Sequence, residues 1–140
     1  MFRHGGQVRD RVIKCFRLVR LFATAILGAL AVFQVSLIAG APLGHLAWGG
    51  QHRILPRNLR IGSAVSLALY GIFAYVALAR AGLAVPLISG TFTDVSAWVL
   101  TAYFAVGVVM NGISRSRPER LTMTPVALVL ALLFLVLSLG

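Results

Sequence analysis

The sequence predicts an all-α protein, a polytopic membrane four-helix bundle with a basic amphipathic N-terminal segment. Two observations carry this prediction. First, 59% of the 140 residues are hydrophobic and only 11% are charged, a composition too apolar to give a soluble globule its polar surface. Second, the apolar residues form four runs, each near the ~20 residues that cross ~30 Å of hydrocarbon as a helix. These spans are expected at about residues 18–38, 61–81, 95–111 and 121–139.

The spans are expected to be helices rather than strands. Backbone polar groups in lipid must be paired within the protein, and runs of this length lack the alternation of a membrane strand. The chain shows no repeat or low-complexity tract. We therefore expect one four-span domain over residues 18–140, preceded by a basic amphipathic tail over residues 1–17.

The net charge of +10 is concentrated in three basic groups. The loop at residues 82–94 contains no Lys or Arg. The three groups lie in the tail (Arg3, Arg9, Arg11, Lys14, Arg17, Arg20), before the second span (Arg53, Arg57, Arg60) and before the fourth span (Arg115, Arg117, Arg120, with Glu119).

As a helix, the tail places Val8, Val12, Phe16 and Val19 on one side and most of its basic residues on the other. Such a helix lies at the lipid surface, where each cationic side chain gains ~1 kcal/mol near anionic headgroups. The alternative is a disordered basic tail that only supplies a topology signal, and both interpretations stay open. Because the tail lacks interleaved aromatic residues and a fold to present its charges, we expect no nucleic-acid partner.

The charge distribution leaves the orientation nearly balanced. With four crossings, the tail side carries seven Lys and Arg residues and the arginine-loop side carries six, so the positive-inside rule gives almost no bias. The neutral loop at 82–94 is typical of an outside loop. We therefore expect the loops at residues 39–60 and 112–120 to be cytoplasmic, in a protein integral to the cytoplasmic membrane.

Polar residues within the spans gather toward the arginine-loop ends, where Gln34 and Asn111 are the two amides. Polar side chains inside a membrane are costly when they face lipid, so they indicate either interhelical hydrogen bonds or contact with a ligand. The two amides could meet across the bundle. Neither interpretation is excluded by the sequence.

The segment at residues 40–60 is the least ordinary part of the chain. Its glycines and prolines rule out a continuous helix, yet Leu43, Leu46 and Trp48 are too apolar for a free loop. We expect a half-buried interfacial or re-entrant segment that covers the polar ends of the spans, with Trp48 as an interfacial anchor. The alternative is a compact connector packed on the bundle. Trp98 is the second expected anchor.

Catalytic and metal-binding patterns are scarce. Cys15 is the single cysteine, so no internal disulfide can form. His45 and His52 lie outside the spans, and the carboxylates Asp10, Asp94 and Glu119 are expected to be too distant or exposed to complete a metal site. No nucleophile elbow is present. We expect no catalytic residue, no metal and no cofactor.

Two stretches of the chain carry a resemblance to a protein family: FQVSLIAGAPLGHLAWGGQHRILPRNLRIGS at 33–63 and MNGISRSRPERLTMTPVALVLAL at 110–132. Through them the chain resembles an uncharacterised group of small four-span bacterial integral membrane proteins. The resemblance implies the architecture and no biochemical activity. The basic tail over residues 1–20 departs from the pattern of the group.

Three functional interpretations remain. The leading one is a non-catalytic accessory component that packs against a larger membrane protein or a second copy of the chain, in contact with membrane lipids. The second is a site for an anionic amphiphile, such as a lipid headgroup or a lipid-linked intermediate, and the third is a small-solute transporter. The expected ligand-binding residues are Gln34, Gln51, His52, Arg53, Arg57, Arg60, Asn111, Arg115, Arg117 and Arg120.

Overall fold

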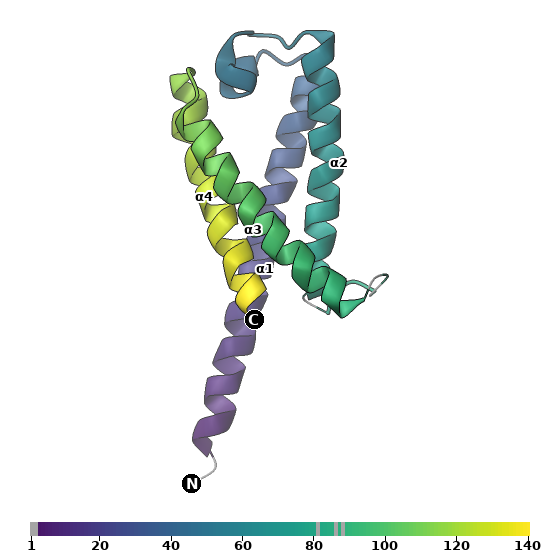
Figure 1. The fold of residues 1–140 in the computed structure, drawn as a ribbon, viewed down its shortest axis with the longest axis vertical. Coiled ribbons are helices and arrows are strands. Elements are labelled where there is room, and N and C mark those ends of the chain that lie inside the picture. The colour runs from purple at the N-terminus through teal and green to yellow at the C-terminus, as the bar shows by residue number, and fades with distance from the viewer. Residues whose placement is uncertain (1–2, 81, 86, 88) are drawn as a thin grey trace.

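The computed structural model describes residues 3–80, 82–85, 87 and 89–140, with side chains from Gly5 onward. It confirms the predicted all-α fold, and the described residues contain no strand. Figure 1 shows the four long helices and the connection between the first two. The helices are α1 (Arg3–Ile38), α2 (Arg57–Arg80), α3 (Gly90–Gly112) and α4 (Arg117–Leu139).

All four helices are long and apolar enough to cross a membrane, which indicates a multi-pass membrane protein. Helices α2, α3 and α4 have 23 or 24 residues, or about 35 Å at 1.5 Å per residue. The expected spans fall within the helices, apart from residue 81, which lies outside the described residues. The helices begin earlier than predicted because polar first turns precede their apolar runs; Ser89 and Ser116 cap α3 and α4 by accepting a backbone N–H.

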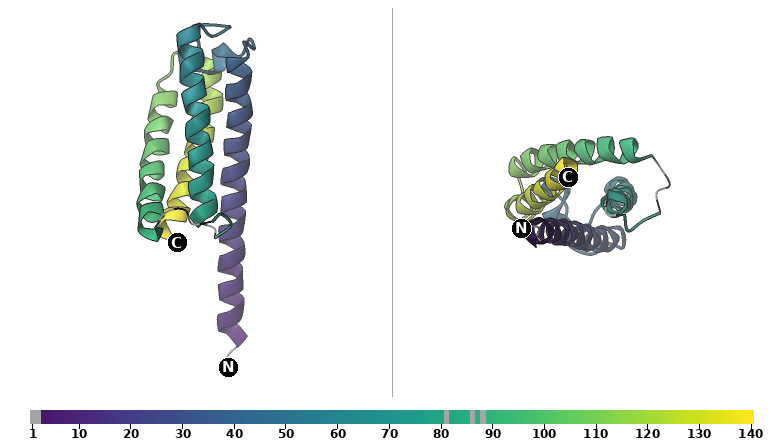
Figure 2. Two further views of the ribbon diagram at one scale, coloured as in Figure 1. Left: turned by 90° about the vertical axis from the view of Figure 1, so that its right-hand side faces the viewer. Right: turned by 90° about the horizontal axis from the view of Figure 1, so that it is seen from below.

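The helices run up and down as two closely packed pairs, α1 with α2 and α3 with α4. The views in Figures 1 and 2 agree that α3 starts beside the end of α2 and moves away from it toward the α1–α2 connection. Small residues allow the close α3–α4 packing, because Gly107 faces Ala127 across the pair. The bundle is therefore tight at the tail end and splayed at the other.

The main core fills the middle of the bundle and its tail-side half. Its largest members are aromatic: the rings of Phe73 and Tyr103 lie 5.2 Å apart, and Phe104 stacks on Phe134 at 5.4 Å. Leu130 packs in the same cluster. This ring cluster joins α2, α3 and α4 and closes the bundle below its splayed end.

A second, smaller core holds residues 39–56, which we call the lid, over the splayed end (Figure 1). Leu37 of α1 is buried together with Ala47 and Leu55 of the lid. The lid contains two short 3₁₀ turns, η1 (Gly44–Leu46) and η2 (Trp48–Gly50). Its two limbs touch at Gly44, whose N–H donates to the carbonyl of Arg53 at 2.9 Å.

Helix α1 is longer than the other three, with 36 residues, or about 54 Å. It passes the expected tail boundary at residue 17 without a break, and its first turns project beyond the bundle (Figure 2). The tail is thus helical and collinear with the first span. The other end of the chain, Gly140, lies against the ring of Phe16, so α1 has no helical neighbour below that level among the described residues.

Arg80 joins three helices at the tail end. Its guanidinium donates two hydrogen bonds to the carbonyl of Leu137 in α4, at 2.6 and 3.2 Å, and forms an ion pair with Asp94 in α3. The Thr101 and Ser138 hydroxyls lie 3.1 Å apart nearby. The tail-side half of the bundle, away from the arginine-loop ends, therefore carries its own polar contacts.

Candidate functional site

A cavity of about 670 Å³ lies beneath the lid, between the lid-side parts of α1, α3 and α4. This volume is within the range of about 300–1,000 Å³ that is usual for small-molecule sites. The cavity exists because α3 leaves α2 toward this end, so that no helix fills the space under the lid (Figure 1).

The walls of the cavity are mainly apolar. Leu30 and Phe33 line it from α1, and Tyr70 and Phe104 form part of its floor above the ring cluster. On α3 the lining runs over residues 103–113, a rise of about 15 Å. Since the hydrocarbon of a bilayer is ~30 Å thick, the cavity spans about one leaflet.

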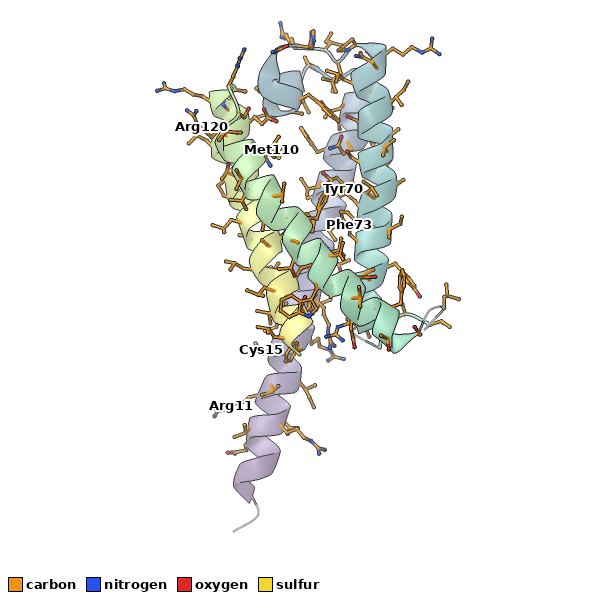
Figure 3. All side chains as sticks on the ribbon, viewed as in Figure 1. Arg11, Cys15, Tyr70, Phe73, Met110 and Arg120 are labelled. Atoms are coloured by element: carbon orange, nitrogen blue, oxygen red, sulfur yellow. The ribbon has the colours of Figure 1, made fainter. Side chains whose placement is uncertain are left out.

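One side of the cavity is open. Three α3 residues line it and are at the same time exposed on the outside of the bundle: Tyr103, Val106 and Met110, the last with 61% exposure. Figure 3 shows Met110 on α3 and Tyr70 on α2 at either side of the space under the lid. The opening therefore lies between α2 and α3, where a membrane would place acyl chains.

The lid forms the ceiling through contacts with two helices. The indole N–H of Trp48 donates to the buried hydroxyl of Ser63 in α2 at 3.2 Å, and the ring covers Gly62 so closely that a Cβ there would lie 2.7 Å from it. Trp48 lines the cavity and is 43% exposed. On the other side, the hydroxyl of Ser116, at the start of α4, donates to the carbonyl of His45.

Glu119 is the second link between the lid and α4, and it is buried with 7% exposure. Ser116 and Glu119 have the spacing of a capping box, in which the glutamate reaches back to the N-cap N–H. Here the N–H of Ser116 donates to the hydroxyl of Ser114 instead, and Glu119 Oε2 accepts from the N–H of Gly49 at 2.9 Å and from the Ser114 hydroxyl. Glu119 is therefore a buried link between the lid and α4, a role that the sequence interpretation did not assign to it.

Gln34 and Asn111 both line the cavity, from α1 and α3. Gln34 is buried, and its Oε1 has no partner among the described residues. Asn111 donates to the carbonyl of Gly107 in its own helix at 2.8 Å. The described contacts do not join the two amides to each other, although they face one space.

The six loop arginines do not form one ring. Arg115 lines the cavity, and the described residues give it no hydrogen bond or ion pair. Arg60 donates to the carbonyl of Leu55, and Arg120 to the carbonyl of Ser114, so both stabilise turns. The remaining expected site residues are exposed and do not line the cavity: Gln51, His52, Arg53, Arg57 and Arg117.

Of the expected set, the structure therefore brings Gln34, Asn111 and Arg115 to one cavity. The sequence interpretation missed Glu119 and the aromatic floor. The capping-box spacing of Ser116 and Glu119 was a signal for the role of Glu119. Tyrosines inside an apolar run, such as Tyr70 and Tyr103, were a weak signal for the aromatic floor.

The second expected anchor, Trp98, is half exposed on α3 in the opposite half of the bundle. It takes no part in the cavity. The chain matches no protein-family model, no curated protein and no solved structure, so the resemblance to small four-span bacterial membrane proteins stays a prediction.

Proposed function

We propose that the protein binds one amphiphile in the cavity, with its apolar part between the helices and an acidic headgroup beside Arg115. The observation that carries this proposal is the combination of a leaflet-deep apolar cavity, a side opening between α2 and α3, and a lining arginine, Arg115, that is exposed and has no hydrogen bond or ion pair among the described residues. A headgroup anion in that position gains charge-assisted hydrogen bonds, which are about twice as strong as neutral ones.

The ring cluster supports binding over small-solute transport. A solute pathway would have to continue from the cavity through the tail-side half, where Phe73, Tyr103, Phe104 and Phe134 pack ring against ring. Interiors packed in this way leave few voids larger than a water molecule. A binding site, by contrast, needs only the single opening.

A photo-crosslinking pair tests the proposal. Met110 and Val109 are neighbours with 61% exposure each, but only Met110 lines the cavity. We expect p-benzoylphenylalanine at position 110 to capture a lipid-sized adduct in the detergent-purified protein, detected by intact-mass spectrometry. At position 109, where lipid is removed with the membrane, we expect none.

Equal adducts at both positions, or none at either, would contradict a bound amphiphile. The accessory-component interpretation makes a different prediction for the same preparation. It requires a stoichiometric protein partner, and not a lipid, to be retained in native mass spectrometry in mild detergent.

For orientation, we propose that the lid and the α3–α4 turn face the cytoplasm. Arg53, Arg57 and Arg117 are exposed at that end, whereas the 82–94 loop carries no Lys or Arg. In a Cys15→Ser background, we expect an impermeant maleimide to label Ser89→Cys in intact cells and Arg57→Cys only after lysis. Labelling of position 57 but not 89 in intact cells would reverse the orientation.

A further inference from the structure

We propose that the amphiphile is zwitterionic: its acidic group lies at Arg115 and a primary ammonium in the same headgroup binds the carboxylate of Glu119. This inference rests on the proposed function and specifies the ligand class of the same cavity. It replaces a purely anionic headgroup with one that carries both charges.

The first observation is that two opposite charges lie at one end of the cavity without neutralising each other. Arg115 and Glu119 both line it. The ion pair found among the described residues joins Arg80 and Asp94 at the other end of the bundle, and none joins Arg115 to Glu119. A cation and an anion held apart in this way complement a headgroup with the opposite order of charges.

The second observation concerns the two oxygens of Glu119. Oε2 accepts both hydrogen bonds of this side chain, from the Gly49 N–H and the Ser114 hydroxyl. Oε1 accepts none in the described part of the chain, and it is not among the fully enclosed polar atoms that lack a partner there. One carboxylate oxygen of this cavity-lining residue is thus anchored, and the other is accessible and has no partner among the described residues.

Among the described residues, no basic side chain pairs with Glu119. Glu119 lies in the first turn of α4, where the positive end of the helix dipole favours an acidic side chain. The N–H of Gly49 and the Ser114 hydroxyl add hydrogen bonds to the charged form. An ammonium donor from a ligand would complete this set.

The cavity wall holds a second hydrogen-bond acceptor that lacks a partner. Gln34 Oε1, a buried acceptor on the cavity wall, has no partner among the described residues. Three cavity-lining residues can therefore offer a ligand two acceptors, Glu119 Oε1 and Gln34 Oε1, and one cation, Arg115. A primary ammonium supplies N–H donors for acceptors, whereas a quaternary ammonium has none.

The test compares lipids with identical acyl chains, titrated into the purified protein in detergent and followed by native mass spectrometry. The probes are phosphatidylethanolamine, phosphatidylcholine and phosphatidic acid, with glycerophosphoethanolamine as the soluble headgroup. We expect phosphatidylethanolamine to bind about tenfold more tightly than either other lipid, the size of one charge-assisted hydrogen bond. The soluble headgroup should not bind at the same concentrations.

Two variants assign the preference to its residues. Glu119→Gln keeps an amide oxygen for the Gly49 N–H but loses the charge, so it should bind all three lipids alike while phosphatidic acid binding is retained. Arg115→Gln should weaken all three. Arg117→Gln is the matched control, because Arg117 is exposed in the same turn and does not line the cavity; it should leave binding unchanged.

The outcomes separate the inference from the proposed function. If the wild-type protein binds no lipid, or binds the soluble headgroup as tightly, the proposed function is wrong. If it binds the three lipids equally, or if Glu119→Gln keeps the preference, the zwitterionic inference is wrong and the proposed function stands. Should Glu119→Gln fail to fold, as judged by thermal unfolding, the wild-type preference among the three lipids decides.

Discussion

Gly44→Ala is expected to lower the free energy of unfolding by about 2–4 kcal/mol. A methyl group at this position would overlap the carbonyl oxygen of His52. The obstacle is backbone, which cannot rotate away as a side chain can, and Gly44 already donates to the next carbonyl, that of Arg53. The two limbs of the lid would have to separate. Thermal unfolding in detergent measures the effect.

Gly71→Ala is the control for that change. Gly71 lies inside α2 with nothing within 4 Å of an added Cβ, so the same substitution should be neutral or stabilise by about 0.5–1 kcal/mol. If Gly44→Ala unfolded at the same temperature as Gly71→Ala, the close contact between the limbs of the lid would be contradicted. Because the lid is the ceiling of the cavity, Gly44→Ala should also lower lipid retention.

Arg80→Met is the second substitution with a large expected effect, a loss of about 2–3 kcal/mol. It keeps much of the apolar stem but removes two hydrogen bonds from a charged donor to the Leu137 carbonyl. Such bonds contribute about 1.5–3 kcal/mol each, and hydration of the freed carbonyl offsets part of the loss. Helices α2 and α4 are joined by few other contacts. The denaturation midpoint in a detergent–denaturant titration measures the loss.

Asp94→Asn separates the two roles of Arg80. The Asp94 side chain is 59% exposed, and exposed ion pairs contribute about 0–1 kcal/mol. We therefore expect Asp94→Asn to cost at most about 1 kcal/mol. Equal losses for Arg80→Met and Asp94→Asn would show that the ion pair, and not the contact with the end of α4, holds the three helices together.

The spans were predictable from the sequence because apolar runs of about 20 residues have one stable arrangement in lipid, the helix. The lid was predictable in outline, since Gly40, Pro42 and Pro56 interrupt the helix while Trp48 and Leu55 require burial. The residues that the lid contacts could not be predicted. Whether Trp48 meets Ser63 depends on how the segment turns back, and several glycines there have positive φ values that widen the choice of turns.

The cavity could not be predicted because it follows from the divergence of α2 and α3, which is a property of packing across the whole bundle. The charge pattern also predicted more arginines at the ligand site than the structure places there. Arg60 and Arg120 are as basic as Arg115, yet each donates to a nearby carbonyl that the end of a helix or turn leaves without a backbone partner. The role of Glu119 was missed because sequence alone does not show that the lid brings Gly49 to it.

The long first helix has a consequence for how deep the protein sits in the bilayer. Two belts of cations flank the apolar bundle: Lys14 and Arg17 lie at its tail end, and Arg53 and Arg57 are exposed at its lid end. Sliding in either direction would pull a belt of cations into acyl chains, which costs several kcal/mol per charge. We therefore expect the two belts to fix the immersion depth of the bundle, so that, under the proposed function, a phospholipid moving sideways within the lid-side leaflet would reach Arg115 at the natural height of its own headgroup.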